Sequence, residues 1–266
     1  MKDSQIVKYL ADNWEKCGVE QRDVLLVHSS LKRLLLKVSH EFGVRISIKT
    51  VYNSFLEVLG EKGTLILPLF NFDFPKTKFF DICNTPSQMG SLTEIGRLDE
   101  SSVRTGHPIY SFSVFGYHKK EFININNYSG YGPDSPFAVI KALDGKIAII
   151  GLTDQHSMTS YHFVEEENNV DYRYYEEFEG KYIDRDGEKT HRKYALYVRN
   201  LAENVQTDVN RMMNYLWLNG FYKGEKHDEG YGMRTIKFRD LYQQTEKIIK
   251  KGEAINYLYS IKKTNL

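Results

Sequence analysis

The sequence VLLVHSSL, residues 24–31, decides the fold. Its four leading apolar residues are typical of a strand that is buried on both faces of a parallel sheet. Residues 48–59 then carry apolar side chains at helical spacing, and the run GTLILP, residues 63–68, is a second buried strand. Because a strand, a helix and a strand in this order make a βαβ unit, the sequence predicts an α/β fold.

The rest of the chain is predicted to extend this unit on both sides. Helices are expected at residues 1–18, from Ser91 onward, and at 135–143, 158–168, 204–218 and 239–251. Strands are expected near 111–115 and at 146–150, an ordered loop at 69–90, and a β-hairpin around Asp186-Gly187. We therefore expect one unit over residues 1–266, with a mainly parallel central sheet flanked by helices and a C-terminal part made of a hairpin and helices.

The composition argues against several classes of protein. The 36 Lys and Arg residues are balanced by 35 Asp and Glu residues, so net charge gives no evidence for a nucleic-acid partner. No stretch approaches the roughly 18 continuous apolar residues that a membrane span needs, and the first residues lack the apolar centre of a signal peptide. With two cysteines, Cys17 and Cys83, the chain is expected in the reducing cytoplasm. The sequence does not define an oligomeric state; a homodimer is one option.

One predicted helix carries the pattern of an acid–base site. His162 and Glu165 are three residues apart and therefore share a helix face, and Thr159 lies one turn earlier. A histidine titrates near ~6.5 and can take the proton that an attacking ammonium must lose. A neighbouring carboxylate can fix the ring tautomer and stabilise the imidazolium, and a hydroxyl can hydrogen-bond a thioester oxygen or a leaving sulfur. The alternative is a surface helix with an ordinary His–Glu pair.

Polar residues also gather where the predicted strands end, which is where open α/β sheets bind ligands. The segment 28–31 has two hydroxyls and a run of backbone amides that could hold a phosphate, although a serine helix cap would also explain it. Residues 85–90, with Asn71 and Asp73 upstream, and residues 104–111 are two further polar loops. Ordinary turn chemistry would also explain the first of them, and a capped loop histidine the second.

Together, these segments resemble the aminoglycoside 3-N-acetyltransferase family, also called the antibiotic N-acetyltransferases. The matching patches come in the family's order over residues 20–175. They are His28 to Leu31; Gly63-Thr64-Leu65 with Pro68 and Phe70; Thr85-Pro86-Ser87 with Met89-Gly90 and Leu92; Arg104 with His107-Pro108 and Ser111; Gly132-Pro133 with Ser135-Pro136-Phe137; Lys146 to Gly151; Thr159 with His162 and Glu165; and Tyr172-Arg173.

The resemblance implies an acyl-CoA co-substrate and direct transfer to an amine without an acyl-enzyme; no metal is expected. By position it implies that His162 is the base, Glu165 its orienting carboxylate and Thr159 the neighbour of the thioester. The residues expected to bind coenzyme A are His28, Ser29, Ser30, Leu31, Arg104, His107, Ser111 and Phe112. Those expected to contact the acceptor are Asn71, Asp73, Asn84, Tyr161 and Glu166.

The charge of the C-terminal part indicates the class of acceptor. An aminoglycoside is a polycation and needs a cleft dense in carboxylates, whereas residues 185–199 supply five basic side chains among tyrosines. This mixture suits phosphates and a stacked base. A nucleotide-linked amino-dideoxy sugar, of the dTDP-3-amino or 4-amino type, is therefore the expected acceptor. An aminoglycoside is the alternative, which the acidic run at 165–177 would suit.

Three other activities are weighed against acyl transfer. His28, His107 and His162 could converge as metal ligands of a hydrolase, but no pair has a short ligand spacing. The chain has no Gly-x-Ser-x-Gly elbow, which argues against a serine hydrolase. Cys83 could act as a covalent nucleophile instead. A non-catalytic binding module would have no chemical reason to keep the histidine, the glutamate and the threonine together.

Overall fold

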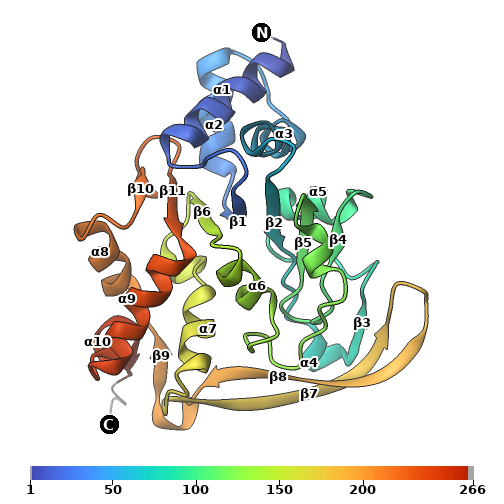
Figure 1. The fold of residues 1–266 in the computed structure, drawn as a ribbon, viewed down its shortest axis with the longest axis vertical. Coiled ribbons are helices and arrows are strands. Elements are labelled where there is room, and N and C mark those ends of the chain that lie inside the picture. Colours follow the sequence, from blue (N-terminus) through green and yellow to red (C-terminus); the bar gives the residue numbers. More distant parts are fainter. Residues whose placement is uncertain (1, 263–266) are drawn as a thin grey trace.

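The computed structural model describes residues 2–262. Its centre is a seven-stranded sheet in the order β10-β11-β6-β1-β2-β5-β4 (Figure 1). In that order the strands span Lys223–Gly224, Met233–Lys237, Lys146–Ile150, Val24–Ser29, Thr64–Pro68, Phe112–Gly116 and Val103–Arg104. Strands β6, β1 and β2 pair in parallel, and the other neighbours pair antiparallel. The α/β class and the βαβ unit are confirmed. The sheet is mixed rather than mainly parallel, because an apolar run indicates burial and not strand direction.

Helices cover both faces of this sheet, and the alternation along each strand decides which face a side chain reaches. Leu25 and Val27 of β1 point into a core with α1 (Asp3–Lys16), α2 (Lys32–Phe42), α3 (Ile48–Leu59) and α5 (Ser91–Leu98). Leu26 points into a second core with α6 (Pro136–Ala142), α7 (Ser160–Glu167), α8 (Asn210–Leu218), α9 (Phe238–Lys250) and α10 (Ala254–Tyr257). His28, two residues after Leu26, is therefore on the second face.

A long β-hairpin runs along one end of the molecule, lowest in the view of Figure 1. It consists of β7 (Arg173–Ile183) and β8 (Lys189–Arg199), and β3 (Phe79–Asp81) pairs in parallel with β7. The predicted turn at Asp186-Gly187 is confirmed. Gly187 has φ 81°, a left-handed conformation that glycine adopts without strain.

The structure differs from the prediction in several segments. Residues 204–218 do not form one helix, because β9 (Val205–Thr207) pairs with β12 (Tyr259–Ile261) and the helix begins at Asn210. The expected loop at 69–90 contains β3 and the short helix α4 (Phe74–Thr77). The strand β11 was not predicted, and the helix α2 was expected only as an option after the serines of segment 28–31.

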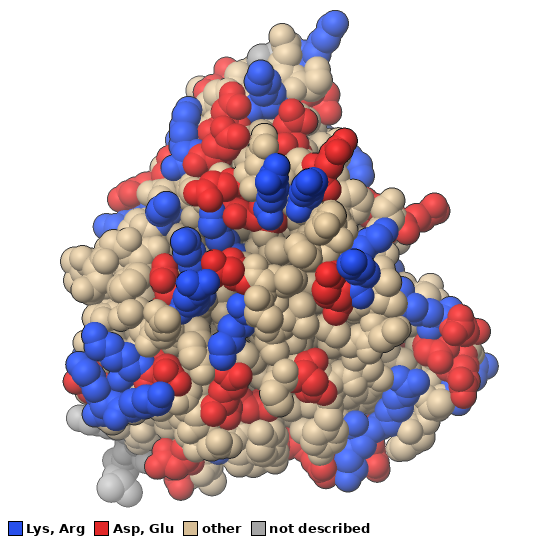
Figure 2. Space-filling view, viewed as in Figure 1, with Lys and Arg blue, Asp and Glu red and all other residues tan. Residues whose placement is uncertain are grey.

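The surface agrees with the balanced composition. Figure 2 shows acidic and basic side chains interspersed, and neither sign forms a continuous patch on the described part of that face. Among residues 2–262, no helix combines the length and the apolar character that crossing a membrane requires.

Candidate active site

A cavity of about 230 Å³ lies at the carboxyl ends of the three parallel strands. This is the place where a sheet of this kind is expected to bind a ligand. The cavity brings together three of the predicted site residues, His28, Thr159 and His162. The other lining residues are Phe70, Phe72, Met89, Asp154, Gln155, His156, Ser157, Met158, Thr207 and Val209.

His162 faces this cavity from α7, and Glu165 holds the other side of its ring. Glu165 Oε2 lies 2.7 Å from Nδ1 of His162. The side chain of Glu165 is 1% exposed, whereas that of His162 is 19% exposed. Because an ionised carboxylate only accepts hydrogen bonds, it places the ring proton on Nδ1 and leaves Nε2 with a free lone pair. The predicted proximity of the two side chains on one helix face is confirmed.

Two further residues fix Glu165 in place. Arg173 Nε lies 2.7 Å from the oxygen that His162 contacts, and Tyr172 donates its hydroxyl to the other oxygen at 3.0 Å. Both residues lie where the chain leaves α7 and enters β7. A buried carboxylate with a cationic partner and several hydrogen bonds stays ionised and ordered. The family resemblance includes Tyr172-Arg173 but implies no role for them.

These contacts set the pKa values of the pair. Burial, and then the positive charge of Arg173, lower the pKa of His162, while Glu165 opposes both. Burial alone would raise the pKa of Glu165, but Arg173 and His162 outweigh it, so the pKa of this carboxyl is lowered. At neutral pH the site therefore holds a neutral imidazole against an ionised carboxylate, which is the resting state of a general base.

A buried ion pair fixes the segment that enters α7. One oxygen of Asp154 accepts hydrogen bonds from Tyr161 at 2.6 Å and Tyr222 at 2.7 Å, and the other lies 2.8 Å from Arg234 Nη2. Arg234 of β11 also donates to the Leu152 carbonyl at 2.6 Å. These bonds hold the segment after β6 that carries Thr159 to the cavity. Asp154 and Arg234 were missed from the sequence; an arginine inside a strand-like stretch was the available signal.

Residues 29–31, predicted to bind coenzyme A, lead from β1 into α2. Ser29 pairs in register with Ile150, and Leu31 is buried in the core beneath α2. Ser30 lines a separate hollow of about 570 Å³ with Lys32, Arg33, Leu36, Lys37, His40 and Gly151. A helix does follow the serines, since α2 begins at Lys32. Phosphate binding by this segment stays a prediction.

The other residues predicted to bind coenzyme A, Arg104, His107, Ser111 and Phe112, are buried around β4 and β5 and do not line the cavity. Arg104 donates to Ser111 Oγ at 3.1 Å and to loop carbonyls. Nδ1 of His107 accepts two backbone amides, and burial lowers the pKa of this ring to about 3. His28, His107 and His162 therefore do not converge on one metal site. Contact of these four residues with coenzyme A stays a prediction.

The five residues predicted to contact the acceptor do not line the cavity either. Each makes a hydrogen bond to a neighbouring part of the protein: Asn71 with Pro86, Asp73 with Gln88, Asn84 with Asp81, Tyr161 with Asp154, and Glu166 with Ser129. Their contact with an acceptor stays a prediction.

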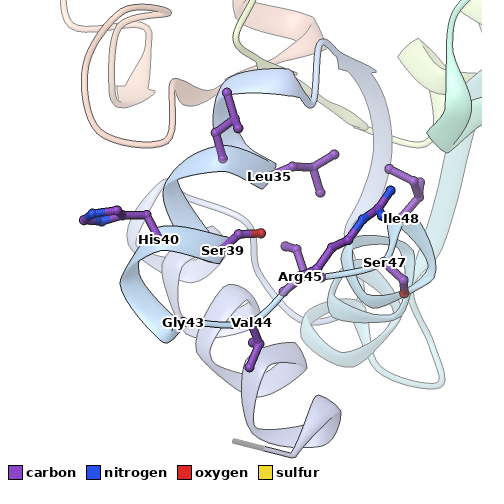
Figure 3. Close-up of a pocket in the computed structure, with 10 residues that line it drawn as sticks. Leu35, Ser39, His40, Gly43, Val44, Arg45, Ser47 and Ile48 are labelled. Carbon is purple, nitrogen blue, oxygen red and sulfur yellow. The ribbon is translucent and has the colours of Figure 1, made fainter.

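A larger hollow, of about 990 Å³, lies elsewhere, between α2 and the segment that leads into α3 (Figure 3). Its lining is mainly apolar, with Arg45 and His40 as its basic side chains. Among the described residues that line it there is no predicted site residue. The cavity beside His162 is therefore the candidate active site.

Comparison with known proteins identifies the family. A family model described as aminoglycoside 3-N-acetyltransferase matches residues 26–250. The chain belongs to this family. The match extends the resemblance found over residues 20–175 through the hairpin and into α9.

Individual relatives of this aminoglycoside 3-N-acetyltransferase family member are distant. An SPbeta prophage-derived aminoglycoside N(3')-acetyltransferase-like protein from Bacillus subtilis is 24% identical over 179 residues, which are 59% of this chain and 63% of that protein. Aminoglycoside N(3)-acetyltransferase IX from Micromonospora chalcea is 26% identical over 182 residues, which are 61% of this chain and 60% of that protein. Each alignment thus spans less than two thirds of the relative. Neither name supports membership of a sugar-nucleotide branch.

The fold also matches solved structures. The structure of AAC-IIIb with CoASH superimposes with a TM-score of 0.76 at 15% identity, covering 95% of this chain and 97% of that one. At this identity the likeness shows the shared fold.

Proposed function

We propose that this protein is an acyl-CoA-dependent N-acyltransferase that acylates the amine of an amino sugar, with His162 as the general base. The observation that carries the proposal is the neutral His162 ring, held by the ionised Glu165, at the wall of a cavity. The relative AAC-IIIb has been solved with CoASH, which supports acyl-CoA as the donor.

The reaction follows from these groups. The amine nitrogen attacks the thioester carbonyl carbon, and Nε2 of His162 takes a proton from that nitrogen as the C–N bond forms. Glu165 stabilises the imidazolium that results. The C–S bond then breaks, and the thiolate of coenzyme A takes the proton from His162. We assign to Thr159, which lines the same cavity as His162, a hydrogen bond to the thioester. Transfer is direct, with no acyl-enzyme.

For the acceptor, the amine of an aminoglycoside is now the first candidate, because relatives in this family are named for it. The basic residues that favoured a sugar nucleotide lie along the hairpin rather than in the cavity lining. One observation still favours the nucleotide-linked amino sugar. Asp154, the one carboxylate among the described lining residues, is already bound to Arg234 and two tyrosines, which leaves a polycation without a free partner there.

A thiol-release assay tests the proposal. Acetyl-CoA and longer acyl-CoAs are each offered to aminoglycosides and to dTDP-linked amino sugars. Free thiol should appear only when an accepted amine is present. His162→Asn should abolish turnover and leave acyl-CoA binding intact, while His118→Asn, a surface histidine paired with Glu121, should keep normal activity. Near-normal kcat in His162→Asn would refute the base assignment. Protection of a sensitive host against gentamicin-like drugs would select the aminoglycoside.

A further inference from the structure

A second histidine lines the same cavity and has no role in the base mechanism. His28 is 4% exposed at the end of β1, on the face of the sheet where Leu26 joins the core with α7. Its ring packs against Phe70, with the ring centroids 6.3 Å apart. Its Nε2 is buried and has no hydrogen-bond partner within residues 2–262. A buried polar nitrogen without a hydrogen-bond partner costs folding free energy. This indicates that a bound ligand supplies the missing partner.

The other polar groups of the cavity lining are already bound to the protein. Gln155 bonds the backbone of residues 207 and 209, Ser157 donates to the Thr153 carbonyl, and His156 is paired with the Thr153 hydroxyl. Asp154 is held by Arg234, and His162 is the base. Thr207 Oγ1 accepts a hydrogen bond from Arg173 at 3.2 Å. Among the described lining residues, His28 and Thr159 are therefore the polar side chains that are left for a substrate.

The charge state of His28 separates it from His162. Burial, and then the positive charge of Arg234, lower the pKa of His28 to about 4. Within residues 2–262 no carboxylate binds its ring, so it is neutral at physiological pH and a poor proton acceptor. A neutral imidazole still carries one N–H donor. Such a ring can polarise a carbonyl without giving up its proton, and it is preorganised because β1 and the core hold it.

From this geometry we infer that His28 is a second catalytic residue, which donates a hydrogen bond to the carbonyl oxygen of the acyl thioester. This inference rests on the proposed function. When the amine attacks, the electron pair of the C=O bond moves to oxygen, and the N–H of His28 stabilises that oxyanion while His162 takes the amine proton. When the C–S bond breaks, the electron pair returns to the carbonyl and the hydrogen bond weakens. His162 and His28 thus have different roles, one as base and one as donor.

Steady-state kinetics test the role. His28→Ala should lower kcat by about 10²- to 10³-fold, with little change in the KM for either substrate, because the interaction strengthens only in the transition state. His28→Gln keeps an N–H donor and should recover part of that loss. A purely structural role would instead lower the thermal midpoint and would not be rescued by Gln. Activity of His28→Ala within threefold of wild type, or a rise in the acceptor KM alone, would overturn the inference.

Binding measured by NMR separates this inference from the proposed function. Ring nitrogens of ¹⁵N-histidine-labelled His162→Asn protein are observed with acetyl-CoA and with coenzyme A, and His28→Gln assigns the His28 signals. Acetyl-CoA should shift these signals. Coenzyme A, which lacks the thioester carbonyl, should not. Equal shifts would refute the contact. If acetyl-CoA shifts the His28 signals but the wild type acylates no amine, the proposed function fails, and the contact between His28 and the thioester stands. If neither compound binds, both are rejected.

Discussion

Replacing Glu165 with Gln removes the charge that stabilises the His162 imidazolium and keeps the size of the side chain. At the 2.7 Å separation of Nδ1 and Oε2, Coulomb attraction at an effective dielectric of ~20 has a ceiling of about 6 kcal/mol. Arg173 lies equally close to the same oxygen and opposes part of it. A charge-assisted hydrogen bond is worth about 1.5–3 kcal/mol net, so kcat/KM should fall by about 10- to 150-fold, and further if the Gln amide forces the wrong ring tautomer.

The pH dependence of kcat/KM should shift in a defined direction in each variant. Glu165 raises the pKa of His162 and Arg173 lowers it. The acidic limb of kcat/KM, measured by thiol release, should therefore move to lower pH in Glu165→Gln and to higher pH in Arg173→Met. Glu121→Gln is the matched control, because Glu121 lies 3.3 Å from Nδ1 of His118 at the same three-residue spacing, outside the cavity. Limbs that move in the same direction, or full activity in Glu165→Gln, would refute the reasoning.

Three further predictions concern stability. Arg234→Met leaves Asp154 as an unpaired buried charge, so urea unfolding should show a loss of about 3–5 kcal/mol, together with a lower kcat as the segment before α7 loosens. Trp14 is fully buried and its ring stacks on Phe55, so Trp14→Ala should also lower the free energy of unfolding by about 3–5 kcal/mol. The kcat per folded molecule should be unchanged. A lower kcat would contradict the separation of the two cores. The pKa of His28 is about 4 and that of His107 about 3 in the folded protein, against 6.5 when unfolded. The unfolded state therefore binds more protons, and the free energy of unfolding should fall from pH ~6.5 to ~4. A flat profile in that range would contradict the burial of these rings.

Local patterns predicted much of the fold and part of the site. The central strands are apolar runs, and the pairing of His162 with Glu165 is a contact within one helical turn, so both were predictable from neighbouring residues. Contacts between distant segments were not. Arg234 reaches Asp154 across 80 positions, from a strand whose short sequence does not stand out. In α2 only Leu34 and Val38 are buried, while Leu36 of the same three-leucine run is exposed, and this continuous run weakens the helical periodicity. The acceptor was predicted from the basic residues at 185–199, which lie in the hairpin and not in the cavity lining.

The same ion pair has a consequence for synthesis of the protein. Asp154 leaves the ribosome 80 residues before Arg234. At translation rates of ~5–20 residues per second, about 4 to 16 s separate them. During that interval the nascent chain already carries His162, Glu165 and α7, but Asp154 has no cationic partner. Pairing of β11 with β6 thus brings in the cation that Asp154 needs and fixes the segment that carries Thr159.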